Sequence, residues 1–494
     1  MKVTFSYKPI SALEADLLVV ILDESKTLHD VDALAVQRAI ERARRLYQEK
    51  RLKREYVTNL DHDAKIPTFI LFSTSLNKNY PLGEVVKIFV ARALQLAKDF
   101  QYRRVAVVMN SSEAQPFVGA VIEGALLGAY TFDKYRTEKN LFFKEVHLEI
   151  VGHESDKATN QAVLRRFGAV SEAVNDCRTL VNEPGAEVYP QVMAEVAAKI
   201  AKARALKCRI LDEKELQKQG YNGLIAVGRG SQHPPRLITL RYRPAKPSRH
   251  TLALVGKGIT FDTGGISIKP ADKMFEMKGD MAGGGAVLYA MQAIGQLKPT
   301  INVVGIVPTA ENFPDALAQR PGDIFYAKNG KSIMVDNTDA EGRLILTDGL
   351  YTAGEQKATH IVDIATLTGS CVRALGHGAA GILGTSQALA GAVKRAGEAQ
   401  GEVFWELPLI EEYRDMLKTP YADINNVGGT VAGAITAALF LREFVPKDTP
   451  WVHLDIAGPF MLDKEWKYYD PGATGFGVKT LVDLCEHFEE YLGE

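Results

Sequence analysis

Apolar residues occur along the chain in two alternating patterns, short continuous runs and longer amphipathic segments. Short runs bounded by turn residues are typical of strands, and apolar positions three or four apart are typical of helices. In the first 150 residues the patterns predict strands at Leu17–Ile21, Pro67–Phe72, Val105–Met109 and Val146–Val151. They predict helices at Val31–Gln48, Gly83–Phe100 and Gln115–Tyr130. This alternation predicts an α/β domain with a largely parallel sheet.

A charged, helix-favouring stretch follows, from Ser155 to Asn182. Glu183-Pro184-Gly185 ends it, because proline disfavours helix in the preceding residue and glycine favours a turn. We place a domain boundary within this stretch, between a smaller N-terminal domain, residues 1–165, and a larger catalytic domain, residues 166–494. The first domain has neither a catalytic cluster nor a phosphate-binding loop. We therefore expect it to serve structure or assembly.

The second domain continues the alternation. Strands are predicted at Cys208–Leu211, Leu237–Tyr242, Leu252–Gly256, Ile301–Pro308, His360–Ile364 and Trp451–Ile456. Helices are predicted at Ala286–Ile294, Leu344–Ala353 and Thr436–Phe444. We expect an α/β fold with a mixed sheet. The glycine clusters at 264–265, 283–285 and 428–429 indicate close packing or loops rather than phosphate binding.

Charged residues gather where one of these strands ends. The strand at 251–255 leads into Lys257, which stands between two glycines, and Asp262 and Lys269 follow within the next twelve positions. Glycines beside charged groups let the backbone approach a ligand closely. Ligands of α/β sheets bind beyond the carboxyl ends of strands. Asp280 adds a further carboxylate just before a Gly-rich segment.

A second charged stretch, Asn337-Thr338-Asp339-Ala340-Glu341-Gly342-Arg343-Leu344, lies about eighty residues downstream. In it Asp339, Glu341 and Arg343 alternate with small or uncharged residues. Alternate residues of an extended segment project to the same side. We therefore expect these three side chains to share one edge just before a helix begins.

Four carboxylates in one pocket, from Asp262, Asp280, Asp339 and Glu341, would raise one another's pKa values unless cations neutralised them. Two divalent metal ions would balance the four negative charges and form a dinuclear hydrolytic site. The alternative is a surface acidic cluster paired with Lys257, Lys269 and Arg343. No histidine or cysteine lies in these segments, and oxygen ligands favour Mg²⁺ or Mn²⁺.

These motifs resemble those of the leucyl (cytosol) aminopeptidase family of dinuclear metallopeptidases. NTDAEGRL matches its signature octapeptide, and VGKGITFDTGGISIKP (255–270) matches its other active-site segment. The resemblance continues through 363–369 and 453–458, and it covers roughly residues 165 to 490. It implies a hydrolase that releases N-terminal amino acids, with a leucine-like preference, from peptides with a free N-terminus. It also implies a homohexamer.

The resemblance further implies a role for each candidate residue. One metal would be held by Lys257, Asp262, Asp280 and Glu341, and the other by Asp262, Asp339 and Glu341. Lys269 would stabilise the oxyanion, and Arg343 would bind a bicarbonate that acts as general base. The pocket for the N-terminal side chain would include Met277, Thr366 and Ala457, although each also suits core packing. The family commonly uses Zn²⁺, often with Mn²⁺ or Mg²⁺ at one position, so the metals stay open.

Composition limits the binding partners, the cysteine chemistry and the location that we expect for this protein. The net charge is −1, so no global field recruits nucleic acid or anionic membrane. The four cysteines lack metal-binding spacing, which favours reduced thiols: Cys177, Cys208, Cys371 and Cys485. Neither a signal-peptide core nor an apolar run of about eighteen residues is present, so we expect a cytoplasmic protein without a membrane span.

Two other functions stay open. One is a different dinuclear hydrolase, such as a phosphoesterase. The other is an additional DNA-binding, regulatory role, which some members of the family have. Near-neutral charge argues against DNA binding as the main role, because phosphate contacts dominate such affinity.

Overall fold

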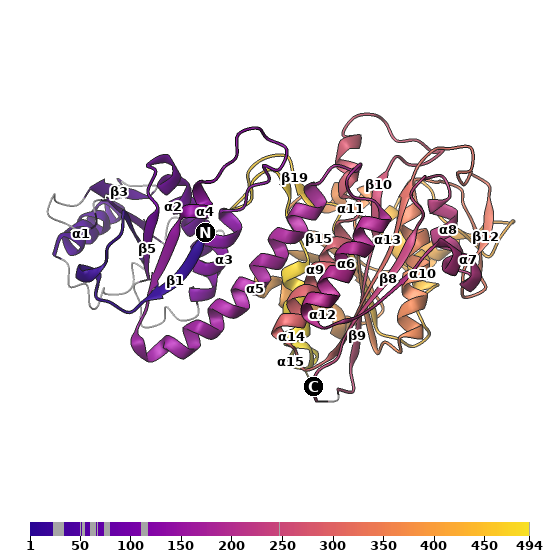
Figure 1. The fold of residues 1–494 in the computed structure, drawn as a ribbon. Helices are drawn as coiled ribbons and strands as arrows, with labels where there is room; N and C mark the ends of the chain where they lie inside the picture. Colours follow the sequence, from indigo (N-terminus) through magenta and orange to yellow (C-terminus); the bar gives the residue numbers. More distant parts are fainter. Residues whose placement is uncertain are drawn as a thin grey trace. The chain divides into compact units, whose positions relative to one another are not determined.

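The computed structural model describes residues 1–22, 34–49, 51, 55–59, 66, 68–73, 80–109, 117–246 and 248–493. The chain forms two compact units (Figure 1), Met1–Glu172 with Lys464–Asp470, and Ala173–Asp463 with Pro471–Glu494. The division falls within helix α5 (Lys157–Asn182), in the stretch where the sequence indicates a connecting helix. A short C-terminal segment belongs to the first unit, which the sequence does not indicate. A role of this unit in assembly stays a prediction.

The first unit contains a six-stranded sheet in the order β1-β6-β5-β2-β4-β3. Its strands are β1 (Lys2–Ser6), β2 (Leu17–Leu22), β3 (Tyr56–Asn59), β4 (Thr68–Ser73), β5 (Arg104–Met109) and β6 (His147–Val151). The β3–β4 pair is antiparallel and the other pairs are parallel. The prediction of a largely parallel sheet is confirmed.

Helices cover both faces of this sheet. They are α1 (Leu34–Gln48), α2 (Leu82–Asp99), α3 (Val118–Gly128), α4 (Phe142–Glu145) and the first part of α5. In β2, Leu17 and Val19 pack into the core that α2 and α3 share, while the alternate residue Leu18 packs into the core under α1. A strand buried on both faces reads as the continuous apolar run seen in the sequence. Of the predicted elements, positions 31–33, 67 and 115–116 lie outside the described residues.

The second unit is built on a nine-stranded sheet in the order β16-β15-β18-β14-β9-β11-β8-β7, with β10 also paired to β11. Its strands are β7 (Lys207–Leu211), β8 (Arg236–Tyr242), β9 (Thr251–Gly256), β10 (Gly258–Asp262), β11 (Asn302–Asn312), β14 (His360–Ala365), β15 (Ala380–Gly384), β16 (Phe404–Glu406) and β18 (Trp451–Asp455). The central pairs are parallel, whereas β7–β8, β8–β11 and β15–β18 are antiparallel. The predicted mixed sheet is confirmed.

Helices and two small sheets complete this unit. The helices are the end of α5, α6 (Pro190–Arg204), α7 (Glu213–Gln219), α8 (Asn222–Gly228), α9 (Ala282–Leu297), α10 (Glu341–Glu355), α11 (Gly369–Leu375), α12 (Gln387–Gln400), α13 (Gly433–Arg442), α14 (Val478–Glu486) and α15 (Phe488–Leu492). One small sheet joins β12 (Ile324–Tyr326), β13 (Ser332–Met334) and β17 (Ile424–Asn425), and the other joins β19 (Met461–Leu462) to β20 (Gly472–Ala473). Among the described residues, none of the helices combines the length and apolar character needed to cross a bilayer.

Close packing of α9 on the sheet brings the charged segments together. A Cβ at Gly283 would lie 2.2 Å from the carbonyl oxygen of Ile364 in β14, and one at Gly256 would lie 2.5 Å from the carbonyl of Gly283. Only glycine fits at such distances, so the start of α9 lies directly on the ends of β9 and β14. Asp280, two residues before α9, is thereby placed beside Lys257, which follows β9.

Candidate active site

Three buried carboxylates converge where the parallel strands end. One oxygen each of Asp262, Asp280 and Glu341 lies within 4.8 Å of the others. Asp262 ends β10, Asp280 precedes α9, and Glu341 is the first residue of α10. Asp339, less buried, joins the group through Lys269. Lys257 and Lys269 pair with these carboxylates. Arg343 follows Glu341 in α10, but its side chain donates to the carbonyl of Asn426.

Lys257 bridges two of the carboxylates. Its Nζ lies 2.8 Å from Oδ2 of Asp280 and 2.9 Å from Oε1 of Glu341. It also donates to the carbonyl oxygen of Thr366, at 3.0 Å. Burial disfavours the charged ammonium, but the surrounding carboxylates outweigh burial and raise the pKa of Lys257. The ammonium of Lys257 therefore offsets part of the negative charge of Asp280 and Glu341.

Lys269 has the same relation to the other side of the cluster. Its Nζ lies 2.8 Å from Oδ2 of Asp262 and 2.5 Å from Oδ1 of Asp339. Its side chain is 22% exposed, compared with 4% for Lys257, so it is the lysine that a bound molecule could reach. Burial opposes its charge, but Asp262, Glu341 and Asp339 raise its pKa.

Despite the two lysines, the pKa values of three of the four carboxyl groups are raised. Burial, and then repulsion from Glu341, raises the pKa of Asp262 to about 6. Burial likewise raises the pKa of Asp280 well above its ordinary value and raises that of Asp339. Oε2 of Glu341 is buried and accepts no hydrogen bond among the described residues. This cluster offers several carboxylate oxygens, and one of them accepts no hydrogen bond from the described residues. Such a set of oxygen donors fits a divalent metal ion.

Neighbouring polar groups orient the carboxylates. Oδ1 of Asp262 accepts hydrogen bonds from Nδ2 of Asn312 (2.9 Å) and from the amide of Gly264 (2.8 Å). Oδ1 of Asp280 accepts one from the hydroxyl of Thr366 (2.7 Å). In each case the other oxygen faces a lysine. Sequence reasoning missed Asn312, because a single asparagine at a strand end carries no distinctive signal.

Arg343 does not lie as the sequence analysis predicts. Helix α10 begins at Glu341, three residues before the predicted start, so the segment is not extended. Helical residues two positions apart project about 200° apart, and the predicted common edge is therefore wrong. Nη1 of Arg343 instead donates to the carbonyl of Asn426, at 2.7 Å, and its Nε is buried without a hydrogen-bond partner in the described chain. Burial lowers the pKa of Arg343 to about 10.

A cavity of about 340 Å³ opens beside the cluster. Six of the seven charged candidate residues line it, all but Arg343, and the three predicted pocket residues, Met277, Thr366 and Ala457, line it too. Sequence reasoning missed several further lining residues: Leu367, Thr368, Gly369, Val372, Phe460 and Met461. Lys273, Glu276, His377 and Asp463 line it as well, so the cavity combines a charged end with a wall that is partly apolar.

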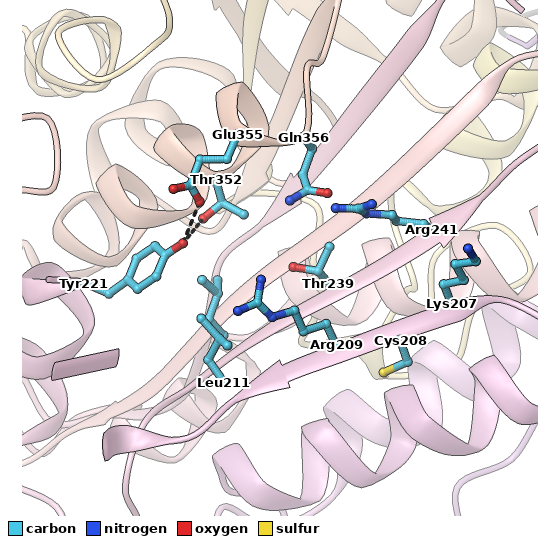
Figure 2. A pocket seen from close by; sticks show the side chains of 11 residues that line it. Lys207, Cys208, Arg209, Leu211, Tyr221, Thr239, Arg241, Thr352, Glu355 and Gln356 are labelled. Carbon is cyan, nitrogen blue, oxygen red and sulfur yellow. Dashed lines mark hydrogen bonds between the residues drawn. The ribbon is translucent and has the colours of Figure 1, made fainter. Parts of the chain in front are cut away.

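A second cavity, of about 230 Å³, lies between strands β7 and β8 and the end of α10 (Figure 2). Lys207, Arg209 and Arg241 project into it from the two strands. Among the described residues that line it, the one carboxylate is Glu355, which accepts a hydrogen bond from the hydroxyl of Tyr221 at 2.8 Å. This cavity lacks a cluster of metal donors, so it is not the candidate reaction centre.

Comparison with known proteins identifies the family of the second unit. Residues 175–482 match the catalytic domain of the cytosol aminopeptidase family. A probable cytosol aminopeptidase of Solibacter usitatus is 43% identical over 98% of this chain and 99% of its own length. One of Aquifex aeolicus is 45% identical over 85% of this chain and 86% of its own.

Solved structures with the same fold cover both units. A mutant of tomato leucine aminopeptidase superposes with a TM-score of 0.86 at 32% identity, over 99% of this chain and 96% of that one. The bottromycin maturation enzyme BotP in complex with Mn superposes with a TM-score of 0.82 at 30% identity, over 96% and 99%. This chain belongs to the cytosol aminopeptidase family, and it is a metal-dependent aminopeptidase, a hydrolase that acts on peptides.

Proposed function

We propose that the enzyme uses two metal ions to release leucine-like residues from peptides with a free N-terminus. The observation that carries this proposal is the group of three buried carboxylates within 4.8 Å, joined to two lysines and open to a cavity with an apolar wall. Two divalent ions bound there would supply an activated water and polarise the scissile carbonyl.

The metal-binding residues would divide as the family resemblance implies. Lys257, Asp262, Asp280 and Glu341 would hold one ion, and Asp262, Asp339 and Glu341 the other. Zn²⁺ and Mn²⁺ are the leading candidates, with Mg²⁺ a third. The resemblance supports zinc, and the manganese complex of BotP supports manganese. Oε2 of Glu341, which accepts no hydrogen bond from the residues that the structure describes, also supports a cation, because buried carboxylate oxygens are normally satisfied.

Two residues would act on the reacting groups. Lys269 would hold its positive charge next to the developing oxyanion, and its partial exposure to the cavity supports this role. Arg343 would bind a bicarbonate that removes the proton from the attacking water. Its buried Nε has no hydrogen-bond partner in the described part of the chain, which supports an anion at that position, since such a donor is costly to leave unpaired.

The cavity wall would select the N-terminal side chain. Met277, Thr366 and Ala457 would line this subsite, together with Leu367, Phe460 and Met461. These side chains are mainly apolar, so burial of a leucine-sized group would favour binding by about 1.5–3 kcal/mol. The free α-amine of the substrate would lie at the charged end, near Asp280.

The test compares leucyl, alanyl and glutamyl p-nitroanilides, an N-acetyl-leucyl analogue and p-nitrophenyl phosphate, with the enzyme chelated and then reloaded with Zn²⁺ or Mn²⁺. We expect leucyl amide to be cleaved best and the acetylated analogue to resist cleavage. Metal titration should reach two ions per chain. Cleavage of the acetylated analogue at a similar rate would contradict the exopeptidase mechanism, and preferential cleavage of the phosphate ester would favour a phosphoesterase.

We also propose a cytoplasmic homohexamer, on the family resemblance and the naming of the relatives as cytosol aminopeptidases. Several large apolar side chains of the second unit are more than 60% exposed, and any of them that lie at a subunit interface would be buried by assembly. They are Ile268, Phe275, Leu317, Tyr326, Trp405, Tyr421 and Val431. Sedimentation of the active enzyme should give six times the chain mass; an active monomer would contradict the proposal.

A further inference from the structure

A fully buried carboxylate, that of Asp455, lies behind the wall of the active-site cavity. Asp455 is the last residue of β18 and has no exposed surface. Its Oδ1 accepts backbone hydrogen bonds from Leu367 (3.1 Å), Thr368 (3.4 Å) and Ala457 (3.2 Å). Its Oδ2 accepts one from the hydroxyl of Thr368, at 2.7 Å. All three donor residues line the cavity.

These donors come from two separate loops. Strands β14 and β18 are parallel neighbours, with Ala365 opposite Asp455, and Leu367 and Ala457 lie just beyond their ends. Each loop contributes one side of the cavity wall. The single carboxylate therefore joins two loops that are almost ninety positions apart in the sequence.

The loop that Asp455 holds also contacts the charged end of the cavity, through Thr366. The carbonyl of Thr366 accepts the hydrogen bond from Nζ of Lys257, and its hydroxyl donates to Asp280. Thr366 directly precedes Leu367, whose amide is bound to Asp455. A shift of this loop would thus move the cavity wall and two residues of the carboxylate cluster together.

Thr368 connects Asp455 to helix α11 by hydrogen bonds. The hydroxyl oxygen of Thr368 accepts the amide hydrogen bond of Cys371 at 3.0 Å, which caps the start of the helix. Gly369 and Val372 of α11 also line the cavity. A carboxylate suits the four donors because both of its oxygens only accept hydrogen bonds, whereas an asparagine offers one acceptor oxygen.

We propose that Asp455 is a positioning residue of the aminopeptidase reaction. It fixes the wall that receives the N-terminal side chain and, through Thr366, the placement of Lys257 and Asp280. The inference rests on the proposed role of this cavity as the side-chain subsite. It differs from a purely structural role, which would change stability but leave substrate selectivity unaltered.

The test uses Asp455→Asn, which keeps the volume of the side chain. The matched control is Asp483→Asn in α14, a buried carboxylate that accepts hydrogen bonds from Gln400 and Tyr491 at 2.7 Å and does not line the cavity. Metal content, melting temperature, and kcat and KM for leucyl and alanyl p-nitroanilide are measured for each metal-loaded variant. Met277→Ala tests the subsite itself.

Asp455→Asn should lower kcat/KM for the leucyl substrate by about 100-fold, the usual effect of displacing a reacting group by about 1 Å. The leucyl-to-alanyl ratio should fall by about tenfold, because the wall no longer fits the larger side chain. The control should keep both values while losing comparable stability. Kinetics of Asp455→Asn within twofold of wild type would overturn the proposal.

A second pair of variants covers the case in which Asp455→Asn does not fold. Thr368→Val removes the hydroxyl bound to Oδ2 of Asp455, and Thr368→Ser keeps it. The valine variant should lose selectivity and the serine variant should restore it; equal kinetics of the two would overturn the proposal. If Met277→Ala leaves the ratio unaltered, the subsite assignment fails instead, independently of Asp455.

Discussion

Replacing Gly342 by alanine should disable the proposed metal site without unfolding the enzyme. Gly342 is the second residue of α10, and a Cβ there would lie 2.5 Å from both Cε and Nζ of Lys257. Ordinary contacts of a Cβ begin at 3.4 Å. The end of the lysine must therefore move by roughly 1 Å, since atoms of this kind do not interpenetrate.

The displacement acts on a group with three short contacts. Nζ of Lys257 lies 2.8 Å from Asp280, 2.9 Å from Glu341 and 3.0 Å from the carbonyl of Thr366, and a shift of that size cannot preserve all three. Misplacement by about 1 Å costs about 100-fold in rate, equivalent to about 2.7 kcal/mol. Folding should be less affected, because the clash involves the end of a side chain and alanine favours a helix by up to about 1 kcal/mol relative to glycine.

The assay measures metal content, kcat/KM for leucyl p-nitroanilide and melting temperature. Gly391→Ala in α12 is the matched control, because its Cβ would meet nothing closer than Arg395, at 3.5 Å. We expect Gly342→Ala to melt near the wild-type temperature, to bind metal more weakly and to lose about 100-fold in kcat/KM. Full metal occupancy with wild-type kinetics would refute the argument that the position of Lys257 is critical.

Three further predictions concern Lys257, Lys269 and Asp348. Lys257→Arg should lose metal and activity together, because a guanidinium cannot supply a neutral lone pair; full metal occupancy in elemental analysis would contradict the ligand role. Lys269→Arg should keep its metals and lose mainly kcat, by about 10²–10³, and stopped assays on the metal-loaded variant measure this. Burial raises the pKa of Asp348 to about 7, so the folded chain keeps a proton that the unfolded chain loses above about pH 4, and stability should fall as the pH rises from about 4 to 7. Asp348→Asn should flatten that slope, and melting temperatures of both proteins across this range would show it; parallel curves would contradict it.

The sequence predicts most strands of the two large sheets, but it does not predict amphipathic helices such as α12 and α14. Strands such as Leu237–Tyr242 are found within a residue of their predicted bounds, because their apolar runs are long and end at turn residues. Strands β1 and β3 were missed, since they are short and only partly buried. The sequence predicts the start of α10 three residues too late, because the alternating charges at 339–343 indicate an extended segment, whereas the helix dipole favours a carboxylate in the first turn of a helix.

The arrangement of the candidate site can also be predicted only in part from sequence patterns. The proximity of Lys257 and Asp262 can be expected, because the parallel strands β9 and β10 end on one edge of the sheet. The partners that hold them in place cannot be inferred in this way. Asn312 and Asp455 act through neighbours 50 and 88 positions away, and such contacts follow from strand order rather than from any local pattern.

The short segment Lys464–Asp470 has a consequence for the order in which the chain folds during synthesis. This segment completes the first unit, where Nζ of Lys467 forms a buried ion pair with Oε2 of Glu84, at 3.0 Å. It leaves the ribosome roughly 290 residues after the rest of that unit, a delay of roughly 15 to 60 s at about 5–20 residues per second. The first unit therefore stays incomplete until nearly all of the second unit has been translated.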